Sequence, residues 1–173
     1  MKRLSLRDWF VTGFIAVLLL VVAYIWFSPT GQLAPDLKLS AFNSDRIIDL
    51  KALRGRPVLV TFWATSCQGC IKEMPHLIEL YKELAPKGLE IIAIAMSYDR
   101  PDHILEMQKQ KQIPYPIVYD GVNEASRAFG DIRLTPTTFL INPQGQIVRQ
   151  KIGEIDMKRL HAQIMAMLNN KTS

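Results

Sequence analysis

The feature that most constrains the fold is the position of the two cysteines, which lie three residues apart in Cys67-Gln68-Gly69-Cys70. They follow an apolar, β-branched and aromatic run from Val58 to Trp63, which is typical of a strand buried on both faces of a sheet. From Met74 to Leu84, apolar side chains recur at helical spacing, with charged side chains on the other faces. The cysteines are therefore predicted at the junction of a central strand and an amphipathic helix.

The rest of the chain alternates between strand and helix patterns. The further predicted elements are a hairpin of strands 37–39 and 47–50, a strand at 89–96, a helix at 102–112, a strand at 116–119, a short helix at 124–129, a hairpin of strands 138–142 and 147–152, and a final helix capped by Asp156 that ends at Leu168. This order predicts an α/β fold in which helices flank a central mixed β-sheet, with an N-terminal β-hairpin.

The N-terminal part predicts a membrane anchor. No charged residue occurs from Trp9 to Phe27, and a helix of that length, at about 1.5 Å per residue, matches the hydrocarbon core of a bilayer. Lys2, Arg3 and Arg7 precede it, so the positive-inside rule leaves residues 1–8 in the cytoplasm and sends the rest across the membrane. A cleaved signal peptide is the alternative, because Val21-Val22-Ala23 resembles a cleavage site.

The remaining boundaries follow from composition. Residues 28–35 contain two prolines and a glycine and predict a linker, so residues 36–173 are predicted to form one folded domain. The formal charge of the whole chain is +5, and two of these charges come from the residues before Trp9. The remaining excess is too small to indicate a nucleic-acid partner.

The cysteine spacing suits reversible disulfide chemistry. At the first turn of a helix, residues i and i+3 share one face, so their Cα atoms fall within the roughly 4.4–6.8 Å that a disulfide needs. The positive end of the helix dipole lowers the pKa of the Cys67 thiol, which makes Cys67 the predicted nucleophile. Cys70, predicted to face the core, would resolve the mixed disulfide. The redox-active pair itself then replaces a cofactor.

Three other interpretations of the cysteines are weaker. A structural disulfide that closes so short a loop would restrain the unfolded chain little. A zinc site needs two further ligands, and His76, His103 and His161 are scattered along the chain, so no metal site is expected. Haem attachment is excluded because Ile71, not histidine, follows Cys70.

The motif around the cysteines resembles the thioredoxin superfamily, specifically its TlpA and ResA branch. The resemblance rests on Phe62-Trp63-Ala64-Thr65-Ser66-Cys67-Gln68-Gly69-Cys70-Ile71-Lys72-Glu73-Met74-Pro75, with further support from residues 96–99, 116–120 and 134–145. It covers roughly residues 35–170 and implies a thioredoxin-like fold.

The resemblance also implies four further site residues. In this family the proline that matches Pro136 is cis and lies beside the cysteines, and the backbone of the preceding residue, here Thr135, pairs with the substrate. Glu73 matches an acid that tunes the protonation of the thiols, although an acid in a first helical turn is also favourable by itself. Trp63 matches a tryptophan beside the active site, although core packing would also explain it.

Two departures from thioredoxin itself argue against general thioredoxin activity. Thr61 stands where thioredoxin has a buried aspartate, and Ser66 stands where it has a tryptophan directly before the first cysteine.

The function implied is a protein-disulfide reductase in the bacterial cytoplasmic membrane, with its catalytic domain on the extracytoplasmic side. Its substrates would be exported proteins such as apocytochrome c, and its partner a membrane electron donor of the DsbD or CcdA type. One alternative is a disulfide-introducing oxidant, because the motif does not set the direction. Another is a copper-site thiol reductant or copper chaperone, suggested by seven methionines. A peroxidase is disfavoured because both cysteines lie at the helix start.

Overall fold

The structure is a computed structural model that describes residues 14–22 and 31–170. Its contacts divide the chain into a unit of residues 1–31 and a unit of residues 32–173. In the first unit, residues 14–22 are helical and exposed. Among the described residues, none of the helices is long and apolar enough to span a bilayer. Much of the predicted anchor, residues 9–13 and 23–27, lies outside the described residues, as do residues 1–8 and 28–30 of the predicted cytoplasmic terminus and linker.

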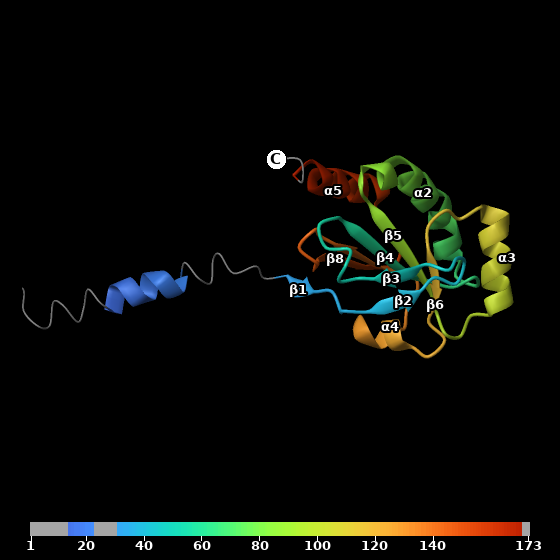
Figure 1. Cartoon of the computed structure of the whole chain (residues 1–173), viewed down its shortest axis with the longest axis horizontal. Helices are drawn as coiled ribbons and strands as arrows, with labels where there is room; N and C mark the ends of the chain where they lie inside the picture. Colours follow the sequence, from blue (N-terminus) through green and yellow to red (C-terminus); the bar gives the residue numbers. More distant parts are fainter. Residues whose placement is uncertain (1–13, 23–30, 171–173) are drawn as a thin grey trace, which may run out of the picture. The chain divides into compact units, whose positions relative to one another are not determined.

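The second unit alternates strands and helices as the sequence predicts (Figure 1). Its elements are β1 (Gln32–Leu33), β2 (Lys38–Ser40), β3 (Ile47–Asp49), β4 (Val58–Trp63), α2 (Gln68–Leu84), the 3₁₀ turn η1 (Ala85–Lys87), β5 (Glu90–Ala95), α3 (Pro101–Lys111), β6 (Ile117–Tyr119), α4 (Glu124–Ala128), β7 (Thr137–Ile141), β8 (Gln146–Ile152) and α5 (Met157–Asn169). Asp156 caps α5 by accepting a hydrogen bond from the Arg159 N–H at 3.0 Å, so the predicted cap is confirmed.

Six strands form one mixed sheet in the order β1-β8-β7-β4-β5-β6. Strand β4 pairs in parallel with β5 and antiparallel with β7, and β5 pairs in parallel with β6. All six residues of β4 are buried, as expected for a central strand that is covered on both faces. The predicted central mixed sheet is confirmed.

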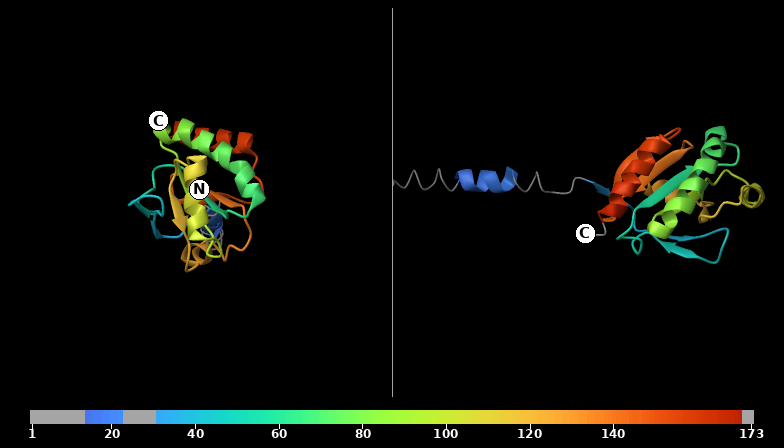
Figure 2. Two further views of the ribbon diagram at one scale, coloured as in Figure 1. Left: turned by 90° about the vertical axis from the view of Figure 1, so that its right-hand side faces the viewer. Right: turned by 90° about the horizontal axis from the view of Figure 1, so that it is seen from above.

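Helices cover both faces of this sheet. On one face, α2 and α5 lie side by side (Figure 2), and Leu77, Leu84 and Ile164 pack on Leu59 and Leu140 of the sheet. On the other face lie α4 and the β2–β3 hairpin. There, the rings of Phe62 and Phe139 in the sheet contact that of Phe129, which follows α4. The two cores therefore pack on the two faces of β4, the strand that leads into α2.

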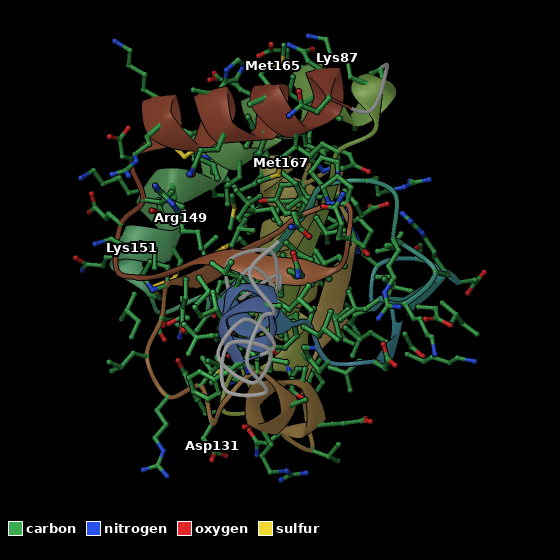
Figure 3. All side chains as sticks on the ribbon, turned by 90° about the vertical axis from the view of Figure 1, so that its left-hand side faces the viewer. Lys87, Asp131, Arg149, Lys151, Met165 and Met167 are labelled. Carbon is green, nitrogen blue, oxygen red and sulfur yellow. A yellow bond between two sulfur atoms is a disulfide. The ribbon has the colours of Figure 1, made fainter. Side chains whose placement is uncertain are left out.

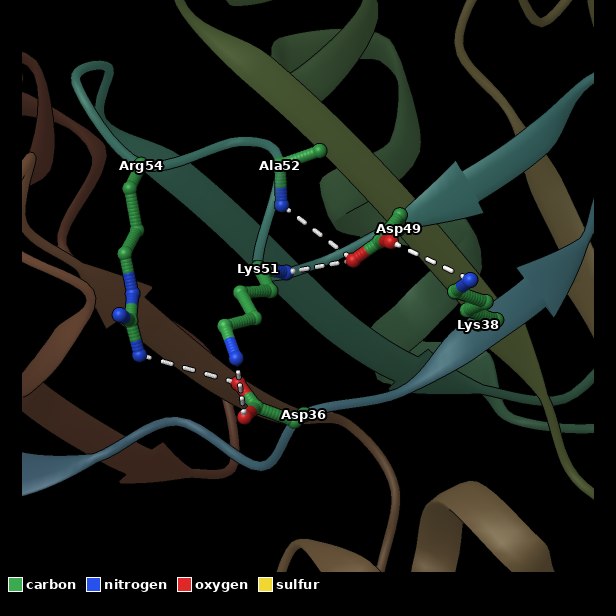
Figure 4. Close-up of polar contacts among 6 residues, drawn as sticks. All are labelled: Asp36, Lys38, Asp49, Lys51, Ala52 and Arg54. Carbon is green, nitrogen blue, oxygen red and sulfur yellow. Dashed lines mark hydrogen bonds and ion pairs between the residues drawn. The ribbon is translucent and has the colours of Figure 1, made fainter.

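The predicted N-terminal hairpin is present as β2 and β3, which pair antiparallel. Polar contacts fix its base (Figure 4): Asp49 accepts the Lys51 and Ala52 N–H groups at 3.0 and 3.2 Å, and Asp36 lies 3.6 Å from Lys51 and 3.7 Å from Arg54. The hairpin also covers the outer edge of β6, where the amide of Asn43 bonds the Tyr115 carbonyl and the Ile117 N–H.

One predicted boundary differs from the structure. Gln32 and Leu33 fall in the predicted linker of residues 28–35, but they form strand β1, which pairs with β8. Both side chains are exposed, so the strand rests on backbone pairing and leaves no pattern of buried side chains in the sequence. The folded unit therefore begins at Gln32 and not at residue 36.

Candidate active site

The two cysteines lie where β4 leads into α2 and form a disulfide with a Cα–Cα distance of 5.3 Å. Cys67 is the N-cap residue of α2 and has an extended backbone, and its sulfur accepts a hydrogen bond from the Cys70 N–H at 3.2 Å. Cys67 is partly exposed, whereas Cys70 is 5% exposed. An incoming disulfide can therefore reach Cys67, while Cys70 contacts the core.

The position of Cys67 favours a thiolate. The first N–H groups of a helix have no partner inside the helix and carry a partial positive charge, and one of them already points at the Cys67 sulfur. The same contact would stabilise a negative sulfur after reduction, which lowers the pKa of the thiol. The more exposed sulfur is thus also the better nucleophile.

The loop before β7 meets the cysteine motif from the other side. The Thr135–Pro136 peptide bond is cis, as the family resemblance implies. Pro136 lies against the residues between the cysteines, because a Cβ added to Gly69 would be 3.4 Å from the Pro136 Cδ. The Pro136 carbonyl accepts the Gly153 N–H at 2.8 Å, which ties this loop to the end of β8. Thr135 and Pro136 are therefore next to the redox pair.

Glu73, one turn after Cys70 in α2, is a buried acid with 5% exposure. Burial raises the pKa of its carboxyl group, while a hydrogen bond from the Ile155 N–H opposes that shift. Glu154 raises the pKa further, and His76 and Lys72 lower it. Glu73 and Cys70 line the same small cavity of about 10 Å³, roughly the space that one water molecule needs. The acid can therefore exchange protons close to the buried sulfur.

Trp63, the last residue of β4, lines this cavity too. Its side chain is 3% exposed, and its indole N–H has no hydrogen-bond partner within the described part of the chain. Trp63 thus both packs in the core and borders the resolving cysteine. Thr61, at the position of the thioredoxin aspartate, also lines the cavity, and its hydroxyl lies 3.2 Å from that of Thr138. The cavity is thus lined by a threonine at the position of the thioredoxin aspartate, and by the carboxyl group of Glu73.

Sequence reasoning missed a residue that supports the site. Asp99, in the turn after β5, is 8% exposed and accepts hydrogen bonds from the N–H and the hydroxyl of Thr65, both at 2.6 Å. Thr65 precedes Cys67 by two residues. The sequence did hold a signal for this contact. Asp99 follows β5, and the carboxyl ends of parallel strands such as β4 and β5 lie at the same edge of the sheet, so Asp99 could be expected near the cysteine motif.

The methionines of the described residues lie in or against the hydrophobic core. Met74 and Met96 are buried, and the other described methionines, Met107, Met157, Met165 and Met167, pack against the core. Met165 and Met167 project from α5 (Figure 3). In residues 14–22 and 31–170, no group of three or more His, Cys, Asp or Glu side chains is arranged to hold a metal ion. The six described methionines therefore contribute to packing.

Comparison with known proteins places the chain in a family. The model of the AhpC/TSA family matches residues 30–150. The thiol-disulfide oxidoreductase ResA of Bacillus thuringiensis subsp. konkukian is 34% identical over 75% of this chain and 73% of that protein. ResA of Bacillus subtilis is 29% identical over 99% of this chain and 97% of its own length.

A solved structure agrees. The solution structure of a candidate thioredoxin from Neisseria meningitidis superposes with a TM-score of 0.74 and 28% identity, over 81% of this chain and 92% of that one. The fold, the disulfide at the start of α2 and these relatives all indicate the same family. The chain belongs to the thioredoxin-like AhpC/TSA family and is a thiol-disulfide oxidoreductase similar to ResA.

Proposed function

We propose that this protein is a membrane-anchored reductase that acts outside the cytoplasm on disulfides of exported proteins, apocytochrome c among them. The observation that carries the proposal is the asymmetry of the pair: a partly exposed Cys67 at the helix start, and a buried Cys70 that shares a cavity with the acid Glu73. The first sulfur suits attack on a large substrate, and the second suits release of that substrate.

In the first step, the Cys67 thiolate of the reduced protein attacks one sulfur of the substrate disulfide. A bond forms between Cys67 and that sulfur, the substrate S–S bond breaks, and the other substrate sulfur leaves as a thiolate that takes up a proton. The backbone of Thr135, beside cis-Pro136, would pair with the substrate chain during this step. The helix N-terminus stabilises Cys67 as the attacking anion.

In the second step, Cys70 gives its proton to the Glu73 carboxylate and attacks the Cys67 sulfur. The mixed disulfide breaks, the second substrate sulfur leaves as a thiolate that takes up a proton, and the Cys67–Cys70 disulfide forms. Two electrons pass from the protein to the substrate. A raised pKa suits Glu73 to this role, because a base is most effective when its pKa lies near the working pH.

A dithiol donor must then reduce the Cys67–Cys70 disulfide again. On the oxidising side of the membrane we expect an integral membrane donor of the DsbD or CcdA type, which carries electrons from the cytoplasm. The uncharged residues 9–27 behind a basic terminus support this location. Alkaline carbonate extraction of cell membranes tests the anchor: the chain should stay with the membrane, and its release would contradict anchoring.

The reduction potential of the Cys67/Cys70 pair tests the direction of electron flow. The full-length protein in detergent is equilibrated with dithiothreitol or glutathione buffers, and free thiols are counted. Cys70→Ser, which cannot form the internal disulfide, serves as the control. We expect a value near or below about −270 mV, the potential of a reductant. A value near about −120 mV would make the protein an oxidant and overturn the proposal.

A further inference from the structure

The turn after β5, Ser97 to Arg100, lies at the sheet edge where β4 ends and the cysteine motif begins. Just before the turn, the Met96 N–H donates a hydrogen bond to the Trp63 carbonyl at 3.0 Å, which joins the end of β5 to the end of β4. Within the turn, the Asp99 N–H donates to the Met96 carbonyl at 3.0 Å. The turn therefore holds a defined position next to the end of β4.

Both carboxylate oxygens of Asp99 accept hydrogen bonds from Thr65, in the loop that leads to Cys67. One oxygen accepts the Thr65 N–H and the other accepts the Thr65 hydroxyl, each at 2.6 Å, and the second oxygen also accepts the Arg100 N–H at 2.9 Å. Next along the chain, the Cys67 N–H donates to the Ala64 carbonyl at 3.1 Å. The Asp99 carboxylate thus holds Thr65 in the turn that leads to Cys67.

The same turn reaches the second half of the site. The Tyr98 hydroxyl lies 3.4 Å from the Thr135 hydroxyl, on the loop of the cis proline. Tyr98 itself is 59% exposed, but its neighbour Ser97 is held on two sides. The Ser97 hydroxyl donates to the Asn123 side chain at 2.6 Å, and the Ser97 carbonyl accepts the Tyr119 hydroxyl at 3.1 Å.

We propose that Asp99 is a positioning residue, which through this turn keeps Cys67 and Thr135 at the spacing that a protein substrate requires. A polypeptide must present its disulfide to Cys67 and its backbone to Thr135 together. A small disulfide needs Cys67 alone. Asp99 therefore acts selectively on polypeptide substrates, whichever way the electrons flow.

The test compares two substrates on the full-length protein. One is a short peptide closed by a single disulfide, and the other is a small aromatic disulfide that releases a coloured thiol. Asp99→Asn leaves one of the Thr65 donors without an acceptor. We expect kcat/KM for the peptide to fall about 10-fold, the effect of one charged hydrogen bond, and kcat/KM for the small disulfide to change less than about 2-fold.

Asp102→Asn is the matched control. It removes the same charge three residues further along, from an exposed side chain that pairs with Arg100 at 2.6 Å and not with Thr65. This variant should match the unmodified protein on both substrates. Equal losses on the peptide and the small disulfide with Asp99→Asn, no loss on either, or the same selective loss with Asp102→Asn would each overturn the proposal.

A second variant covers the case in which Asp99→Asn does not fold, as judged by its thermal unfolding. Thr65→Val removes the hydroxyl donor and leaves the backbone bond to Asp99. It should show the same selective loss on the peptide, and if both variants fold, their combined effect should be smaller than the product of the two, because they remove the same contact. A Thr65→Val protein that folds and handles both substrates normally would contradict the role of Asp99.

Discussion

Two glutamates are almost equally buried at opposite ends of the sheet, Glu73 with 5% and Glu90 with 4% exposure. Glu90 begins β5, beside the first residue of β4, and receives the guanidinium of Arg46 at 2.7 and 3.2 Å, with Arg56 at 3.9 Å. Glu73 lies beyond the other end of β4, near Cys70. Among the described residues, no cation forms an ion pair with Glu73, because the neighbouring Lys72 pairs with Glu154 instead.

From this difference we infer that Glu90 has a structural role and that Glu73 can take part in proton transfer at the site. A buried carboxyl group that is held by two arginines joins distant segments, here the hairpin and β5. The carboxyl group of Glu73 has one backbone donor, and its burial raises its pKa, so that it holds a proton to a higher pH than an exposed glutamate does. The exposed fractions of Glu73 and Glu90 are too similar to distinguish their roles, whereas their hydrogen-bond and ion-pair partners differ.

The largest expected effect comes from Glu73→Gln, which keeps the shape of the side chain and removes the base. We expect disulfide reduction near neutral pH to slow about 100-fold, the lower end for a general base, because Cys70 loses its proton acceptor. Stopped-flow kinetics should show the mixed disulfide with Cys67 accumulating. Undiminished release of the substrate would show that Glu73, like Glu90, is structural.

Next in size is the effect of Arg46→Met on stability. Among the described residues, Glu90 would keep Arg56 alone as an ion-pair partner. The free energy of unfolding should therefore fall by about 2 kcal/mol, less than for a fully buried pair because the Arg46 side chain is 42% exposed. Activity should stay within about 2-fold of the unmodified protein, because this end of the sheet is far from the chemistry. Urea unfolding measures the loss.

Lys38→Met is the control for Arg46→Met, since it breaks the exposed pair with Asp49 and should cost almost nothing. An Arg46→Met protein as stable as the Lys38→Met protein would contradict the structural role assigned to Glu90.

The pH dependence of stability should report the raised pKa of Glu73. Because the pKa of Glu73 is raised in the folded protein, the folded state holds this proton more tightly than the unfolded chain. That contribution to stability is complete below the ordinary glutamate pKa of 4.5 and is lost as the pH rises through the raised value. Glu73→Gln should therefore gain stability relative to the unmodified protein as the pH rises, in urea unfolding of the disulfide forms. A difference that is constant with pH would contradict the raised pKa.

The smallest effects concern the charges near Glu73. Lys72→Gln should raise the pKa of Glu73, because it removes a cation, and Glu154→Gln should lower it, because it removes an anion. Both side chains are more than half exposed, so the shifts should be small and should shrink in high salt. Carboxyl NMR titration of the disulfide form measures them, and shifts in the same direction would be inconsistent with this electrostatic assignment.

The sequence predicted the parts of this molecule that have local patterns. The apolar run of β4, the helical spacing in α2 and the Asp156 cap each lie within a few residues and were confirmed. Strand β1 could not be found in this way, because its pairing with β8 is set more than a hundred positions further along the chain.

The partners of Asp99, Glu73 and Glu90 also lie far from them in sequence. Asp99 meets Thr65 across 34 positions, Arg46 meets Glu90 across 44, and Glu73 meets Ile155 across 82. The sequence could single out Cys67, Cys70 and Glu73 from the motif. It could not predict that Glu73 lacks an ion-pair partner within the described residues or that Asp99 holds Thr65, because both facts depend on the folded topology.

The most direct test of the central claim is the order in which the two cysteines react. The reduced full-length protein is treated with iodoacetamide over a range of pH, and the modified peptides are identified by mass spectrometry. We predict that Cys67 reacts first, with an apparent pKa below the free cysteine value of about 8.5, and that Cys70 remains protected. Faster labelling of Cys70, or a Cys67 pKa at or above the free value, would contradict the assignment of Cys67 as the attacking thiol.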